Sequence, residues 1–170
     1  MIRKIVKYGD PVLETPADLV TDFSDPVLKD LVEDMFDTMY SAKGVGLAAP
    51  QVGVALQLTV IDISAGEDPS QKLVLINPKI TAKEGSQTGE EGCLSIPGFR
   101  EDVTRARKAT VQAVNADGEP LEVTGEDLLA RAMQHEIDHL HGVLFLSHLS
   151  PLKRDLIRRK IKKLDKAGDW

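Results

Sequence analysis

The segment around His135 and His139 constrains this chain most, because it reads His-Glu-x-x-His. Residues four apart lie on one face of an α-helix, so both imidazoles can reach a single metal ion. Glu136 lies beside them and is free to move a proton. A solvated amphipathic helix with a chance repeat is the alternative, but the chain has only four histidines. The segment therefore predicts a helix that carries a metal site.

The ends of this helix are marked in the sequence. Thr124 and Asp127 have the spacing of a capping box, and Gly142 is placed to end the helix in a left-handed conformation. Leu128 and Ala132 share a face with the two histidines, so the metal is expected on the buried side. The remaining histidines are expected to be surface or structural side chains: His141 and His148.

The bulk properties describe one soluble globular domain. The chain has 170 residues, of which 42% are hydrophobic and 28% charged, which is long enough to bury a core. No apolar run has the length of a signal peptide or a membrane span. A single cysteine excludes an internal disulfide, and we therefore expect a protein of the reducing cytoplasm.

Most predicted strands precede the metal-site helix, and helices are expected at both ends of the chain, an order typical of α+β folds with antiparallel sheet. Ser24 can cap a helix over residues 25–43 that stops at Gly44, and residues 44–51 suit a tight loop. Asn115 and Gly118 bound a hairpin turn. The predicted strands cover residues 56–63, 73–76, 109–114 and 121–123.

The C-terminal part is a basic tail on an acidic body. Residues 151–166 hold eight Lys or Arg against two Asp, a net charge of +6 in a chain of −6, which leaves −12 on the remainder. Apolar residues recur there at helical spacing and predict an amphipathic helix: Leu152, Leu156, Ile157, Ile161 and Leu164. We expect a single domain over residues 1–166, and a disordered tail over residues 167–170.

A catalytic metal usually has three protein ligands and one open position, so two histidines need a partner. The only cysteine, Cys93, lies in Glu-Gly-Cys-Leu-Ser, a Gly-containing turn between Gly89 and Pro97. A lone cysteine is commonly a small buried hydrophobe. Its place in a turn, and not in an apolar strand, favours a ligand.

Three motifs together resemble those of the peptide deformylases: Gly-Val-Gly-Leu-Ala-Ala-Pro-Gln at 44–51, Glu-Gly-Cys-Leu-Ser at 91–95, and Gln-His-Glu-Ile-Asp-His-Leu at 134–140. The resemblance implies hydrolytic removal of the N-formyl group from the initiator methionine of nascent chains, with release of formate. It implies Cys93, His135 and His139 as ligands, with a water molecule as the fourth. Such enzymes use one Fe²⁺, for which Zn²⁺ or Ni²⁺ can substitute.

The resemblance also assigns the other site residues. Glu136 would be the general base and acid, and the Gln51 amide with the Leu94 backbone N–H would stabilise the oxyanion. The substrate-binding residues would be Val45 and Gly46 beside the peptide backbone, Leu128 and Ala132 in an apolar methionine pocket, and Arg100 at its mouth.

Two positions depart from the pattern of some members, where bulky apolar residues stand in place of Gly89 and Arg131. Arg131 is expected to lay its stem along the pocket rim with its head in water. Asp138 has two interpretations, an exposed helix residue or a support for the metal site with Arg105 as its partner.

Three rival functions are a His-Glu-x-x-His zinc endopeptidase, a Cys–His hydrolase with Cys93 as nucleophile, and a non-catalytic ribosome-binding module with a structural metal. An endopeptidase commonly takes His or Glu as its third ligand, and a structural zinc site needs a fourth protein ligand. The resemblance further implies that the basic helix over residues 151–166 docks near the ribosomal tunnel exit. No membrane and no specific DNA is expected as a partner.

Overall fold

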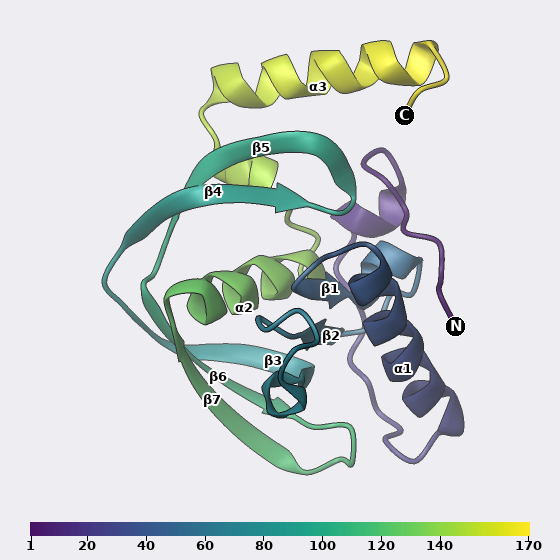
Figure 1. Cartoon of the computed structure of the whole chain (residues 1–170), viewed down its shortest axis with the longest axis vertical. Coiled ribbons are helices and arrows are strands. Elements are labelled where there is room, and N and C mark those ends of the chain that lie inside the picture. Colours follow the sequence, from purple (N-terminus) through teal and green to yellow (C-terminus); the bar gives the residue numbers. More distant parts are fainter.

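The computed structural model describes residues 1–170 and has the expected α+β fold (Figure 1). The helices are α1 (Pro26–Ser41), α2 (Asp127–Leu140) and α3 (Pro151–Lys166). The strands are β1 (Gly46–Ala48), β2 (Leu58–Ile61), β3 (Leu73–Glu84), β4 (Gln87–Cys93), β5 (Ile96–Arg105), β6 (Lys108–Val114) and β7 (Pro120–Glu126).

All strands pair antiparallel, in two separate sheets. The larger sheet has the order β1-β2-β3-β6-β7, and β4 pairs only with β5 in a two-stranded ribbon. Figure 1 shows α2 running between the ribbon and the larger sheet, with α3 on the outer side of the ribbon. The helix predicted to carry the metal site is therefore the central element of the fold.

Helix α2 is buried along most of its length, since ten of its fourteen residues are buried. Ala130, Met133 and Ile137 pack with apolar side chains of the larger sheet. His135 and His139 lie on the other side, toward the ribbon. Polar side chains in such a position need partners inside the protein, and the ribbon supplies them.

The first helix begins one residue later than expected. Asp25, and not Ser24, is its N-cap, and the Asp25 side chain accepts a hydrogen bond from the backbone N–H of Val27. Pro26 occupies the first helical position, where its fixed φ and missing N–H are favourable, so the residue before it becomes the cap. Ser24 donates to Asp22 instead.

The expected capping box of the metal-site helix is wrong. Thr124 belongs to β7, where its hydroxyl lies 2.9 Å from that of Thr110 across the strand pair. Strand β7 leads directly into α2, and Glu126 takes the N-cap position without a side-chain bond. The expected end is confirmed, because Gly142 has a left-handed φ of 76°.

The four predicted strands correspond to β2, β3, β6 and β7, whereas β1, β4 and β5 were not predicted. The sequences of β4 and β5 are rich in Gly, Glu and Arg, and they lack the apolar alternation by which strands are recognised. Residues 44–51 are not only a loop, since they hold β1 and the start of a 3₁₀ turn at Ala49–Val52. The loop prediction was therefore wrong for β1.

Helix α3 confirms the predicted amphipathic segment, although its buried stripe is narrower than expected. Ile157 and Ile161 are buried, whereas Leu152 and Leu156 are exposed. The expected disordered tail is instead folded back: the Trp170 indole N–H donates to the Tyr8 carbonyl oxygen at 2.9 Å. The large Trp170 ring packs on the apolar cluster beneath α3. None of the helices combines the length and apolar character needed to cross a membrane.

The close packing at Gly142 generates a stability prediction. A Cβ at this position would lie 2.8 Å from the backbone carbonyl carbon of Glu14, so Gly142→Ala adds a clash to the strain of a left-handed residue. We expect the free energy of unfolding to fall by about 2–5 kcal/mol in urea denaturation.

Gly168→Ala is the matched control, because Gly168 has a φ of 77° and no atom within 4 Å of an added Cβ. It should lose no more than about 1–2 kcal/mol. Equal losses at Gly142 and Gly168 would contradict the role assigned to the contact with Glu14.

Candidate functional site

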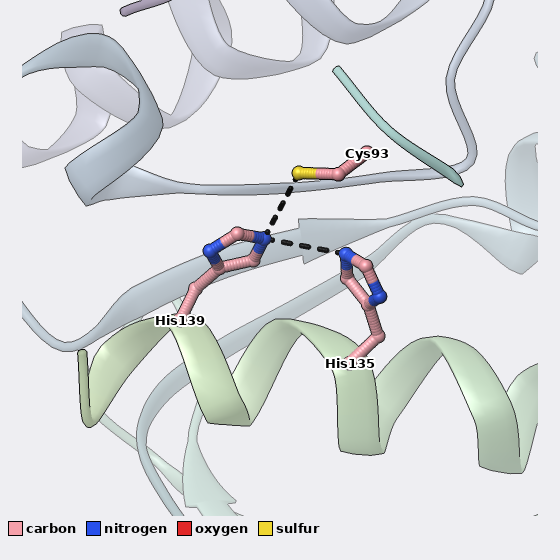
Figure 2. A group of neighbouring side chains, drawn as sticks. All are labelled: Cys93, His135 and His139. Carbon is pink, nitrogen blue, oxygen red and sulfur yellow. Dashed lines mark hydrogen bonds between the residues drawn. The ribbon is translucent and has the colours of Figure 1, made fainter. Parts of the chain in front are cut away.

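Cys93, His135 and His139 converge on one point between the ribbon and α2 (Figure 2). The Nε2 atom of His139 lies 3.4 Å from Cys93 Sγ and 3.2 Å from His135 Nε2. All three donor atoms lie within 4.8 Å of one another. The structure therefore brings together the three residues expected as ligands.

The two separations that involve His139 fit a tetrahedral metal ion. Bonds of about 2.0–2.1 Å to nitrogen and 2.3 Å to sulfur would put two nitrogens about 3.3 Å apart, and nitrogen and sulfur about 3.6 Å apart. The observed 3.2 and 3.4 Å are close to these values. One thiolate with two imidazoles suits a transition metal, and does not suit Mg²⁺ or Ca²⁺.

Cys93 is the last residue of β4, and not part of the expected turn, which follows it at residues 94–95. The pairing of β4 with β5 shifts register between Gly92 and Cys93. Such bulges redirect side chains and are common beside active sites. Here the irregularity coincides with the residue that points toward α2.

Glu91 supports His135 from behind and was missed as a functional residue. Its Oε1 atom lies 2.8 Å from His135 Nδ1. With a proton on Nδ1, the Nε2 lone pair of His135 faces the metal position. The signal available in the sequence was the spacing of two between Glu91 and Cys93, because residues two apart share a face in a regular strand.

Glu91 is also the centre of a buried ion cluster. It accepts hydrogen bonds from Arg105 at 2.6 and 2.9 Å and from Arg131 at 2.5 Å. Burial opposes ionisation of Glu91, but hydrogen bonds from His135 and Arg105 outweigh it and hold its pKa well below the ordinary value. The carboxylate therefore stays charged inside the protein.

Asp138 extends this cluster to the surface. Arg105 Nη1 donates to Asp138 Oδ2 at 2.9 Å, and His148 Nε2 lies 2.8 Å from the same oxygen. The expected pairing of Asp138 with Arg105 is confirmed, and its role as a support for a metal site stays a prediction. His148 is the structural histidine that the sequence suggested, whereas His141 is exposed.

The expected position of Arg131 is wrong. Its head does not lie in water, since the residue is only 8% exposed and its guanidinium binds Glu91 and the carbonyl oxygen of Val103. A buried carboxylate needs a cationic partner, and this need outweighs hydration of the guanidinium. Gly89 leaves the space, because a Cβ there would lie 3.3 Å from Arg131 Nη2.

Glu136 lies beside His135, and one of its carboxylate oxygens has no hydrogen-bond partner in the protein. Its Oε1 is 3.9 Å from His135 Nε2, and its buried Oε2 has no protein partner. Burial raises the pKa of Glu136 to about 7. Gly46 allows β1 to pass close by, because a Cβ there would lie 2.9 Å from Glu136 Oε1.

The Gln51 amide is held in one orientation toward Cys93. Its Oε1 accepts from the backbone N–H of Ala48 at 2.9 Å, which leaves the NH₂ group pointing the other way. Nε2 donates to Ser95 Oγ at 3.2 Å and lies 3.6 Å from Cys93 Sγ. Leu94 follows Cys93 in the turn.

These groups line one open cavity of about 620 Å³. Ten of the eleven site residues expected from the sequence line it: Val45, Gly46, Gln51, Cys93, Leu94, Arg100, Leu128, Ala132, His135 and Glu136. The eleventh, His139, is 1% exposed and does not line the cavity. The cavity thus has apolar wall residues next to a cluster that could hold a metal ion and an unpaired carboxylate oxygen.

The sequence profile of the polypeptide deformylases matches residues 2–155. The chain belongs to this family. A peptide deformylase of Acidobacterium capsulatum is 60% identical over 170 residues, covering 100% of this chain and 99% of the relative. It follows that the chain is an enzyme, of a family that removes N-formyl groups from nascent peptides.

Solved structures agree with this assignment. The peptide deformylase of Legionella pneumophila superposes with a TM-score of 0.91 at 50% identity, covering 99% of this chain and 98% of that one. The enzyme of Thermus thermophilus gives a TM-score of 0.88 at 43% identity, covering 96% and 95%. The sequence similarity and the fold therefore extend over nearly the whole chain.

The Glu91 cluster generates a prediction about metal affinity. Glu91→Gln keeps the shape of the side chain but removes the charge that orients His135, so we expect metal to bind about 10–100-fold more weakly. Glu90→Gln is the matched control, because Glu90 is the exposed neighbour and pairs only with exposed Arg100. Competition with a coloured chelator measures the metal affinity of both variants. Equal affinities of Glu91→Gln and Glu90→Gln would contradict the role of Glu91.

The depressed pKa of Glu91 sets the direction of a pH effect. Its ionised form stabilises the fold above the unfolded-state pKa, near 4.5, and this contribution is lost as the pH falls toward the folded-state pKa. In metal-free protein, the stability difference between the native chain and Glu91→Gln should therefore shrink below pH 4.5. Urea denaturation at several pH values tests this, and a pH-independent difference would contradict it.

Proposed function

We propose that this enzyme hydrolyses the formamide of N-formylmethionine at the start of nascent chains, releasing formate, with one metal ion held by Cys93, His135 and His139. Family membership supports the reaction. The observation that carries the proposal is the convergence of these three donor atoms in an open cavity that also contains Glu136 and Gln51.

The metal is proposed to be Fe²⁺, with Zn²⁺ or Ni²⁺ able to substitute, because the ligand set suits these borderline ions. When bound, such an ion would lower the pKa of a water molecule to about 7. It would also polarise the formyl oxygen. The remaining steps fall to side chains of the chain itself.

Glu136 is proposed to take the proton of the attacking water and to return it to the departing amine nitrogen. Two observations support this role. Its pKa of about 7 allows the carboxyl to hold and release a proton at neutral pH. Its Oε2 has no protein partner that would compete for the proton.

Gln51 and Leu94 are proposed to stabilise the negative charge that develops on the formyl oxygen. The Ala48 backbone already holds the Gln51 amide with its NH₂ group toward Cys93, so the orientation of the amide is fixed before the reaction. The Leu94 N–H follows ligand Cys93 directly and would be held near the same oxygen.

The substrate backbone is proposed to add to β1. This strand is at the edge of the larger sheet, so one of its sides is unpaired, and Val45 and Gly46 line the cavity there. An extended peptide can pair with such an edge. Leu128 and Ala132 would contact the methionine side chain, with Arg100 at the mouth.

Glu136→Gln should keep the metal and lose most turnover. The amide cannot accept the water proton, so we expect kcat for formate release from formyl-Met-Ala-Ser to fall about 10²–10⁴-fold. Metal content, measured on the same samples, is the control for an intact site. Near-native turnover in the metal-loaded variant would overturn the base assignment.

The same assay separates the rival enzymes. An endopeptidase would cleave an internal bond of a longer unformylated peptide, whereas a deformylase releases formate only from formylated ones. A Cys93 nucleophile would survive removal of the metal by a chelator. We expect formate release to be lost on chelation and restored by added metal. This result would support the proposal against the endopeptidase and against the Cys93 nucleophile.

Docking to the ribosome through α3 is also proposed, and its support is electrostatic. The helix has a net charge of +6 in a chain of −6, as expected for contact with RNA phosphates. A cavity of about 760 Å³ between α3 and residues 4–10 adds Lys4 and Lys7 to the basic surface. Exposed Leu152 and Leu156 offer apolar contacts.

Charge removal tests this docking better than truncation, because Ile157 and Ile161 belong to a core cluster. The double variant Lys160→Gln and Lys163→Gln should weaken co-sedimentation with ribosomes and make it less salt-dependent. Lys29→Gln with Lys43→Gln is the control away from α3. Unchanged ribosome binding by the α3 variant would refute the docking role. Ribosome binding that does not weaken with added salt would also refute it.

A further inference from the structure

One wall of the active-site cavity is a segment of β5 that strand pairing does not hold. Gly92 of β4 pairs with Arg100, whereas the next residue of β4 pairs with Ile96. The register therefore gives no partner on β4 to residues 97–99, which we call the wall segment. All three of its residues line the cavity: Pro97, Gly98 and Phe99. Their position must be fixed by other contacts.

Trp170 supplies such contacts at two points. Its indole packs edge-to-face against the Phe99 ring, with the ring centroids 6.2 Å apart and the planes at 60°. The indole N–H also donates to the Tyr8 carbonyl oxygen at 2.9 Å. The Tyr8 backbone N–H in turn donates to the carbonyl oxygen of Ser95 at 2.8 Å, just before the wall segment. Trp170 thus contacts the segment directly and supports its base through Tyr8.

The contact between Phe99 and Trp170 joins the linings of two cavities. Phe99 lines the active-site cavity, and Trp170 lines the cavity between α3 and residues 4–10. Figure 1 shows the chain turning back after α3 toward the N-terminal segment. Closely packed side chains leave few voids, so one of them rarely moves alone. A displaced indole should therefore move Phe99 as well.

A simpler role for Trp170 is to cover the apolar cluster beneath α3, on which both rings pack. That role would contribute to stability only. The additional observation is that its aromatic partner faces the cavity, in a segment without strand partners. The contact is therefore placed to act on whatever fills the cavity.

We propose that Trp170 is a positioning residue, which holds Phe99 against a peptide bound in the active-site cavity. Peptide binding and the seating of the indole are then coupled, and such coupling acts equally in both directions. The proposed function enters only through the choice of a formylated peptide as the ligand.

Kinetics with formyl-Met-Ala-Ser give the first test. Trp170→Ala should raise KM about 2–10-fold, the factor that an edge-to-face aromatic pair contributes to an equilibrium. It should leave kcat within about twofold, because the contact is the same before and during the reaction. Trp170→Phe keeps a ring for Phe99 and should lie nearer the native KM. Leu152→Ala is the control on the solvent side of α3, where Leu152 is 72% exposed.

A double-mutant cycle separates positioning from stability. Phe99→Ala should raise KM by itself, and Trp170→Ala should add nothing to KM once Phe99 is absent. If Trp170 only covered the apolar cluster, Trp170→Ala would lower the free energy of unfolding and leave KM at its native value. Urea denaturation of each variant measures that stability effect separately.

Fluorescence reports the coupling directly, because Trp170 is the only tryptophan of the chain. The measurement uses Zn²⁺-loaded Glu136→Gln protein, in which slow turnover keeps the peptide intact. Saturating formyl-Met-Ala-Ser should change the emission of Trp170. The change should disappear when Phe99→Ala is added to the same protein.

A native KM in Trp170→Ala would overturn the inference, and so would additive effects on KM in the cycle. Emission that bound peptide leaves unchanged would also overturn it. Should Trp170→Ala fail to fold, Phe99→Ala and the emission measurement still decide. Absence of formate release by the metal-loaded native enzyme would instead overturn the proposed function, and the emission measurement does not depend on turnover.

Discussion

The buried Glu91 carboxylate is the interaction on which the site depends. It joins β4 to β5 through Arg105, and it joins the ribbon to α2 through Arg131 and His135. Removing one partner from a buried charge cluster is strongly destabilising, because a charge is left without compensation. The ribbon therefore cannot slide along α2 without breaking several charged hydrogen bonds. The distance from Cys93 to the histidines follows from this constraint.

The same arrangement gives the two buried glutamates, Glu91 and Glu136, opposite pKa shifts. Glu91 is surrounded by cations, which hold its pKa low, whereas burial raises the pKa of Glu136 to about 7. Only the second carboxyl can exchange a proton near neutral pH. Two buried glutamates within the same small region of protein thus differ in pKa because their partners differ.

Small residues determine how closely the chain can pass around the site. Gly46 lets an edge strand lie against Glu136, and Gly89 lets a guanidinium lie over β4. In both places a methyl group would meet a polar side-chain atom at 3.3 Å or less. The cavity is therefore shaped as much by missing side chains as by the residues that line it.

The sequence by itself determined the helix that carries His135 and His139, the basic C-terminal helix and the α+β class, since these follow from the order and spacing of residues. Histidines four apart share a helix face, and isoleucines four apart form a buried stripe. The three motifs also indicated the family, because their combination is specific where each alone is not. The residue types of the ligand cluster followed from these motifs as well.

Only the tertiary structure decided how the ribbon meets the helix. Strands β4 and β5 lack apolar alternation in part because two of their buried residues, Glu91 and Arg105, are charged, and Glu91 has a partner 44 positions away. The local sequence pattern does not indicate charged pairs between residues so far apart in the chain. Arg131 was expected in water because its side chain is amphipathic. Its guanidinium is buried because it binds the buried carboxylate of Glu91, a partner that the local sequence does not reveal.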